Sequence, residues 1–214
     1  MVATEGEEAF GAFFEGVGVH MTKGGSLPEY EHQYLQGLSG HALREAWSAL
    51  VDETADAYRA LDPSVRVPWA GPSMSARSAI SARQMETWAH GQEVFDILGV
   101  AREERDRIRN IVVLGINTYG WTFKVRGETP PGPMPLVELT SPSGALWTYG
   151  EPQDGSVIRG EAVEFAQVVT QTRNIADTHL TVVGECASRW MQNAQCFAGG
   201  ANPPPPQGSR FKTE

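Results

Sequence analysis

Apolar positions recur at steps of three and four along the second quarter of the chain, which is the spacing of one helix face. After Ser39 the repeat reads Leu43, Trp47, Leu50, Thr54, Tyr58 and Leu61, and charged residues occupy the opposite side. This pattern predicts an amphipathic helix that ends before Asp62. A second long helix is predicted to begin at Ser73 or Ser75 and to end at Gly99, with apolar residues on more than one side. Such a helix is typical of the centre of a bundle.

The segments on either side of these helices carry different patterns. A third helix is predicted to begin in the charged run at residues 102–109. Its inner stripe consists of Ile108, Val112, Gly115 or Ile116, Tyr119 and Phe123. The first 38 residues show no long helical period, because glycines interrupt the aromatic cluster of Phe10, Phe13 and Phe14.

The second half of the chain changes character from helix to strand. Four prolines between residues 130 and 135 exclude a helix there. Two β-type runs follow, at residues 136–140 and 145–149, and the four-residue loop between them predicts a hairpin. A short strand is predicted at residues 156–159, followed by helices near 163–173 and around Trp190.

These elements predict an α+β fold, with helices first and a small hairpin unit covered by helices after them. The first domain, residues 1–124, is expected to be helical. A small α/β domain with the hairpin would span residues 125–200, and residues 201–214 would form a proline-rich disordered tail.

Composition and charge narrow the classes of protein that the chain can belong to. No apolar run approaches the roughly 20 residues that span a bilayer, so no membrane partner is expected. Residues 1–62 hold three basic and eleven acidic side chains, a net charge of -8, which argues against a nucleic-acid partner. The chain has two cysteines, Cys186 and Cys196, too few for a disulfide framework, and a cytoplasmic location is expected.

The sequence from Gln84 to His90 is the most informative stretch for chemistry. Glu86 and His90 are four residues apart, so on a helix their side chains point the same way. A carboxylate and an imidazole at that spacing can reach one divalent cation, and borderline metals such as zinc, the first candidate, accept both ligand types. The same spacing also makes an ordinary ion pair on a helix surface. Burial of the helix would favour the metal, because buried charged groups need a partner.

A metal site needs at least one further ligand, and the sequence leaves its identity open. Of the remaining histidines His20 is the first candidate, although solvation is the favoured interpretation for each of them. Arg173, at the predicted end of a helix, could bind an anionic group of a substrate, or it could simply complement the helix dipole. No spacing organises a nucleophile with a base, so catalytic residues stay unassigned.

Several runs of this sequence resemble a known family. VPWAGPSMSAR at residues 67–77 and QMETWAHGQEV at residues 84–94 resemble the metal-ligand helix of the DinB-like superfamily, in the branch related to mycothiol-dependent maleylpyruvate isomerase. VELTSPSG at residues 137–144, LWTYG at 146–150 and FAQVVTQTR at 165–173 resemble the appended domain called "wyosine base formation". The similarity covers roughly residues 39–200.

The resemblance implies a four-helix bundle that holds one divalent metal through a histidine on its second helix and a glutamate and a histidine on its fourth. Glu86 and His90 match the fourth-helix pair, whereas the second-helix histidine has no counterpart. The resemblance therefore implies that the chain lacks the first two helices and that residues 1–124 form an incomplete bundle. A second subunit in a homo-oligomer could supply the missing helices.

The resemblance also implies a reaction class and its partners. A low-molecular-weight thiol would act on a small-molecule substrate in a transferase or isomerase reaction. The alternative is a non-catalytic remnant, or a small-molecule-binding module, in which the helices serve only as a scaffold.

Overall fold

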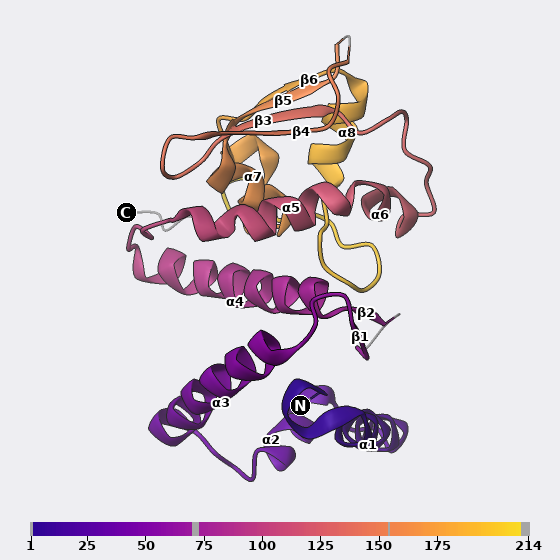
Figure 1. Ribbon diagram of the computed structural model, residues 1–214, viewed down its shortest axis with the longest axis vertical. Coiled ribbons are helices and arrows are strands. Elements are labelled where there is room, and N and C mark those ends of the chain that lie inside the picture. Colours follow the sequence, from indigo (N-terminus) through magenta and orange to yellow (C-terminus); the bar gives the residue numbers. More distant parts are fainter. Residues whose placement is uncertain (1, 70–72, 154, 211–214) are drawn as a thin grey trace. The chain divides into compact units, whose positions relative to one another are not determined.

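The computed structural model describes residues 2–69, 73–153 and 155–210 (Figure 1). The chain divides into two compact units, Met1–Ile80 and Ser81–Glu214. Helices make up most of the first unit, and a four-stranded mixed sheet with helices makes up most of the second. The predicted α+β class is confirmed. None of the helices over the described residues is both long and apolar enough to cross a membrane.

The first unit contains α1 (Val2–Thr22), α2 (Leu27–Tyr34), α3 (Gly40–Ala60) and the short strands β1 (Arg66–Val67) and β2 (Met74–Ser75). Helix α1 contacts both α2 and α3. The predicted helix after Ser39 is confirmed as α3. Strands β1 and β2 pair antiparallel just before α4 begins.

Helix α1 corrects the expectation that the first 38 residues have no long helix. It runs for 21 residues with one non-helical residue, Gly6 (φ 88°). The remaining glycines in α1 keep helical backbone angles. At Gly16 close packing against α2 leaves no room for a larger residue. A Cβ atom at Gly16 would lie 2.0 Å from the Tyr30 hydroxyl oxygen of α2. Of the glycines that obscure the period, Gly16 therefore lets α2 approach α1, at a modest cost in helix propensity.

The second unit is built on a sheet with the strand order β4-β3-β5-β6. The strands are β3 (Leu136–Thr140), β4 (Leu146–Tyr149), β5 (Val157–Glu161) and β6 (Thr181–Val183). Strands β3 and β4 form the predicted antiparallel hairpin, β5 pairs parallel with β3, and β6 pairs antiparallel with β5. β6 was not predicted, because three residues carry too little alternation to be seen in a sequence.

Helices cover one face of this sheet. α7 (Ala162–Val169) and α8 (Glu185–Asn193) lie next to the strands, with α5 (Arg109–Asn117) and α6 (Tyr119–Lys124) beyond them (Figure 1). The strand side chains on the covered face are fully or almost fully buried: Val137, Leu139, Trp147 and Ile158. The predicted boundary near residue 125 lies inside this unit, so α5 and α6 share a core with the strands.

The buried stripe of the predicted third helix is confirmed, but the helix is not continuous. It consists of a 3-10 turn, Asp106–Ile108, followed by α5 and α6. Thr118 separates α5 from α6, and its hydroxyl donates to the carbonyl of Leu114, 2.8 Å away. Such back-bonding is a common cause of a bend in a helix.

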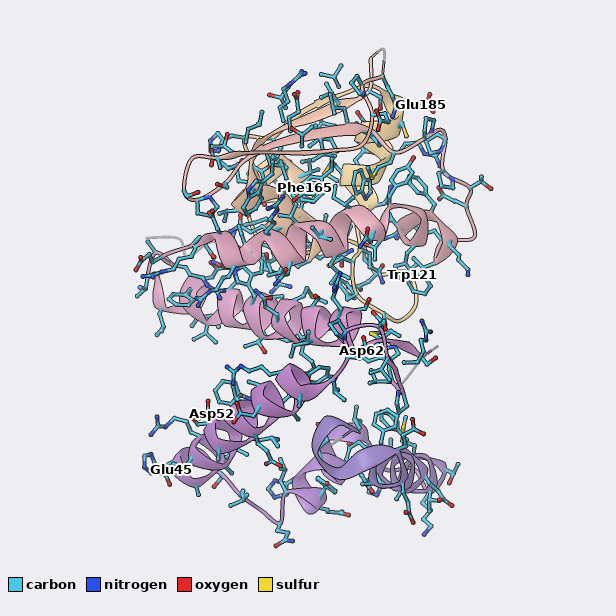
Figure 2. All side chains as sticks on the ribbon, in the orientation of Figure 1. Glu45, Asp52, Asp62, Trp121, Phe165 and Glu185 are labelled. Carbon is cyan, nitrogen blue, oxygen red and sulfur yellow. The ribbon has the colours of Figure 1, made fainter. Side chains whose placement is uncertain are left out.

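The core of the second unit centres on Trp190 of α8, which is fully buried. Its ring centroid lies 5.0 Å from that of Tyr119 and 5.7 Å from that of Phe165, both with edge-on geometry. Figure 2 shows Phe165 between the sheet and α5. A Cβ atom at Gly115 would lie 2.8 Å from Cγ2 of Val169, so α5 and α7 pack at a separation that only glycine permits.

The Tyr119 hydroxyl makes the stability of the second unit depend on pH. It donates to the carbonyl of Gly132 at 2.8 Å and also lies 2.8 Å from the Cys186 sulfur. Burial, followed by the hydrogen bond with Cys186, raises the Tyr119 pKa well above its ordinary value of 10.0. Because the native state then holds this proton more tightly than the unfolded state, its stabilising contribution is complete below about pH 10 and is lost at higher pH.

We therefore expect Tyr119→Phe to cost about 1 kcal/mol of unfolding free energy at neutral pH. The same variant should lose less stability than wild type between about pH 9 and pH 11. Urea unfolding at both pH values measures the difference. Tyr149→Phe, on the edge strand β4, is the control for the chemical change. If Tyr119→Phe and wild type lose the same unfolding free energy between these pH values, the raised pKa of Tyr119 is not the cause of the loss.

Candidate functional site

A cavity of about 480 Å³ lies within the second unit. One wall is a face of α4 (Ala76–Leu98), and a second wall is the turn that follows α7. The third wall is the chain after α8. The lining residues are Met85, Glu86, Ala89, His90, Glu93, Thr170, Gln171, Thr172, Phe197, Asn202, Pro203, Pro204, Pro205, Pro206 and Arg210. The predicted metal-ligand pair and the proline-rich segment therefore meet at one site.

Glu86 and His90 lie one turn apart on α4 and point into this cavity. Their Oε2 and Nε2 atoms are 3.4 Å apart. The expectation that this part of α4 is buried is wrong, because the His90 side chain is 74% exposed and that of Glu86 is 41% exposed. α4 buries other positions instead, among them Met85 and Trp88. The pair is therefore hydrated and does not require a metal to offset its desolvation.

Two further charged groups extend the pair. The Glu93 Oε2 atom lies 3.7 Å from Nδ1 of His90, so the imidazole has a carboxylate on each side. The other Glu93 oxygen, Oε1, accepts a hydrogen bond of 2.5 Å from Nη1 of Arg210. Sequence spacing places Glu93 close to His90 on one helix, whereas Arg210 is 117 residues from Glu93 and carries no local signal.

The side chains of Glu86, His90 and Glu93 do not make a complete metal site. The two carboxylates meet opposite nitrogens of a single imidazole, so the three side chains do not converge on one point. Over residues 2–69, 73–153 and 155–210, no group of three or more His, Cys, Asp or Glu side chains could hold a metal ion. Structural and catalytic zinc sites commonly use at least three protein ligands. Glu86 and His90 thus fit two ligand positions and leave the set incomplete.

Cys196 lies in the electrostatic neighbourhood of Glu86 and does not complete the set. Burial and then the Glu86 carboxylate raise the pKa of the Cys196 thiol far above its usual range. Since a metal takes the thiolate form of cysteine, both effects work against ligation by Cys196.

His20 lies in the first unit, in the last turn of α1. Its ring packs against Gly25, where a Cβ atom would lie 2.1 Å from Nε2, and tilts against Tyr30 at a centroid distance of 5.7 Å. The Nε2 atom is 3.8 Å from Glu29. The His20 ring is thus held by the turn after α1 and by α2. The role of His20 as a metal ligand stays a prediction.

Arg173 is buried beside α4. Its Nη1 and Nη2 atoms each donate to a separate oxygen of Asp96 at 2.6 Å, and Nη1 also donates to the Thr172 carbonyl. The Arg173 side chain is only 7% exposed. The structure thus gives its charge a structural partner in Asp96, and its role as a substrate contact stays a prediction.

The turn after α7 holds an unusual backbone conformation. The helix predicted to reach Arg173 ends at Val169, because Gln171 adopts a left-handed conformation (φ 57°) while it is buried. Its side-chain amide donates to the carbonyls of Ala194 and Asn202 at 3.0 and 2.8 Å. Asn202 donates back to the Gln171 oxygen at 2.9 Å. A strained, buried glutamine therefore fixes one wall of the cavity.

The same interactions correct the expectation of a disordered tail. Asn174 donates to the Pro205 carbonyl at 2.8 Å, and the Gly208 amide donates to both carboxylate oxygens of Asp177 at 3.0 Å. Residues 202–210 are therefore docked on the second unit. Residues 211–214 lie outside the described part of the chain.

Comparison with known proteins supports part of the family assignment. Residues 7–95 match the model of the mycothiol maleylpyruvate isomerase N-terminal domain. This match confirms the resemblance for that segment, which includes Glu86 and His90. The resemblance of residues 137–173 to a "wyosine base formation" domain stays a prediction.

The curated relatives do not add an activity. Two uncharacterized proteins of Mycobacterium tuberculosis, Rv0036c of strain H37Rv and MT0041 of strain CDC 1551, are each 39% identical to this chain over 165 residues. The matched region covers 77% of this chain and 64% of each relative, so the chain spans slightly less than two thirds of their length. No solved structure matches the chain significantly.

Proposed function

We propose that the chain is a divalent-metal-binding protein of the maleylpyruvate isomerase type and that Glu86 and His90 are its ligands in the cavity of the second unit. One observation carries the proposal: the two residues that match the family's ligand pair line a cavity large enough for a small molecule. Zinc accepts both carboxylate and imidazole ligands and is the ion that we propose.

The reaction class that we propose is a thiol-dependent transfer or isomerisation of a small-molecule substrate, with a low-molecular-weight thiol as co-substrate. It rests on the match of residues 7–95 to the isomerase family. The cavity wall supports binding of a polar substrate, because Thr170, Gln171 and Thr172 line it beside the apolar side chains of Met85 and Phe197. Since two protein donors make an incomplete site, no chemical step is assigned to the ion.

Zinc titration of His90→Ala tests the site. Wild-type protein freed of metal should bind zinc measurably by isothermal titration calorimetry, whereas His90→Ala should lose at least about tenfold in affinity, because Glu86 is then the only one left of the two proposed ligands. Glu86→Gln should show a loss of similar size.

The chain offers a matched control on α3. His41 and Glu45 also form an i,i+4 pair, with Nε2 and Oε1 2.9 Å apart and both side chains exposed. His41→Ala should leave zinc affinity unchanged. Equal losses in His41→Ala and His90→Ala would indicate unspecific surface binding and would refute the proposed site.

The incomplete donor set favours a second candidate, a non-catalytic small-molecule-binding module. In that case a ligand of the cavity should stabilise the protein against heat, and neither a chelator nor Glu86→Gln should change that stabilisation. Loss of the stabilisation on chelation would favour the metal-binding proposal instead.

A further inference from the structure

The wall that follows α7 offers hydrogen-bond acceptors to the cavity rather than donors. The hydroxyls of Thr170 and Thr172 donate to backbone carbonyls of α7 at 2.8 and 3.3 Å, so each hydroxyl proton is already engaged. The Gln171 amide nitrogen donates to two carbonyls, which uses both of its N–H groups. The backbone N–H groups of these three residues also donate to carbonyls of α7. A ligand that faces this wall therefore meets oxygen lone pairs.

The other two walls strengthen this excess of acceptors. The four prolines at 203–206 have no backbone N–H and can contribute only carbonyls and apolar rings. On α4, Glu86 has no hydrogen-bond or ion-pair partner among the described residues except His90, whose Nε2 atom is 3.4 Å away. Glu86, Glu93 and Arg210 are the charged groups of the lining, which gives it a net charge of -1 while His90 is neutral. Both the charge and the hydrogen-bonding capacity of the cavity therefore favour a cation that carries N–H groups.

The chain itself places one such cation in the cavity. Arg210 belongs to the lining, and its Nη1 atom donates to Oε1 of Glu93 at 2.5 Å. Glu93 lies two turns after Glu86 on α4, and both side chains face the cavity. The Arg210 guanidinium is thus an internal example of the group that these carboxylates accept. Glu86 offers a second carboxylate to a cation that is not part of the chain.

Apolar surface lies close to the Glu86 carboxylate. Met85 and Phe197 line the cavity together with the four prolines. Burial, and then the nearby Glu86 carboxylate, raise the pKa of the Cys196 thiol, and Phe197 is the next residue in the chain. A nitrogen group bound at Glu86 therefore has apolar surface beside it, on which the rest of a ligand can pack.

We propose that the cavity binds a small organic cation, in which an amidinium or primary ammonium group meets the Glu86 carboxylate and an apolar body packs against Met85, Phe197 and the prolines. The cavity volume of about 480 Å³ suits a molecule of this kind. This inference rests on the proposed function only in taking the cavity as a ligand site, and it involves no metal ion.

Benzamidine, which joins an amidinium group to a phenyl ring, is the probe that tests this class of ligand. In a buffer that contains EDTA it should bind saturably with a Kd of about 1 mM or tighter, measured by NMR from shifts of the His90 and Phe197 resonances. Benzoate has the same ring and the opposite charge, so it should bind at least about tenfold more weakly. Methylguanidinium has the charge without the ring and should also bind at least about tenfold more weakly.

Glu86→Gln keeps the size of the side chain and removes its charge, so it should weaken benzamidine binding at least about fivefold. Glu45→Gln on α3 is the matched control, since Glu45 also pairs with a histidine four residues away and its loss changes the net charge equally. Equal benzamidine affinities in Glu86→Gln and Glu45→Gln would overturn the inference. Equal binding of benzoate and benzamidine would overturn it as well.

The same measurements separate this inference from the proposed metal site. If benzamidine does not bind in EDTA while zinc binds to wild type and is weakened in His90→Ala, the organic cation is overturned and the metal site stands. If benzamidine binds in EDTA and zinc does not bind, the metal site is refuted and the cavity is a site for a small organic cation.

Discussion

Replacing Asp96 with alanine is expected to lower the free energy of unfolding by about 3–5 kcal/mol, because it removes one partner of a buried ion pair. Asp96 accepts two hydrogen bonds of 2.6 Å from Arg173, and its Oδ1 atom also accepts one from Gln92. The side chains of Asp96 and Arg173 are 15% and 7% exposed. The variant would remove the Asp96 carboxylate from the guanidinium in a site that water hardly reaches.

Two comparisons separate this effect from a general loss of charge. Asp56→Ala removes the carboxylate of an exposed pair on α3 and should cost less than about 1 kcal/mol. The double variant Asp96→Leu with Arg173→Met replaces both charges with apolar groups and should recover most of the loss. Guanidinium unfolding followed by circular dichroism gives all three values. A loss of under 1 kcal/mol in Asp96→Ala would show that the pair is solvated in solution.

Replacing Trp190 with alanine is expected to cost about 3–5 kcal/mol, since it removes the largest fully buried side chain of the second unit. The indole touches Tyr119 of α6 and Phe165 of α7, so three helices lose their common contact. Edge-on aromatic pairs add to the cost beyond the buried area. The cavity left behind cannot close without moving a helix, because neighbouring contacts such as Gly115 against Val169 are already tight.

Trp47→Ala on α3 provides the control of the same chemistry on the surface. The Trp47 side chain is 53% exposed, so its loss should change the unfolding free energy by about 1 kcal/mol or less. Trp190→Phe should recover part of the Trp190→Ala loss, because it refills part of the cavity. If Trp47→Ala and Trp190→Ala prove equally destabilising, Trp190 is not the centre of the core.

Elements with a long, regular period could be predicted from the sequence. Helix α3 and helix α4 follow from apolar spacing, and Gly99 ends α4 with the positive φ of 62° that its residue type indicates. The β3–β4 hairpin follows from two β-type runs and a turn-forming loop. In each case the decisive contacts lie within about 25 residues of sequence, so a local pattern carries the information.

The remaining features depend on contacts that no local pattern contains. Glycines obscure α1, although Gly16 is there to admit Tyr30. The composition of α4 predicted a buried helix, but apolar spacing does not reveal how many neighbours a helix has, and His90 proved exposed. The position of residues 202–210 depends in part on the hydrogen bond from Arg210 to Glu93, two residues at opposite ends of the second unit's sequence.

The contacts that hold residues 202–210 have a practical consequence for anyone who purifies this protein. A polyhistidine tag fused after Glu214 would begin five residues beyond Arg210, and five extended residues reach at most about 18 Å. Imidazoles of such a tag would therefore be within reach of the cavity, which Arg210, Glu86 and His90 line. The tag could supply the missing donor and produce an artificial zinc stoichiometry. Material for metal measurements should carry its affinity tag at the other end of the chain, or none.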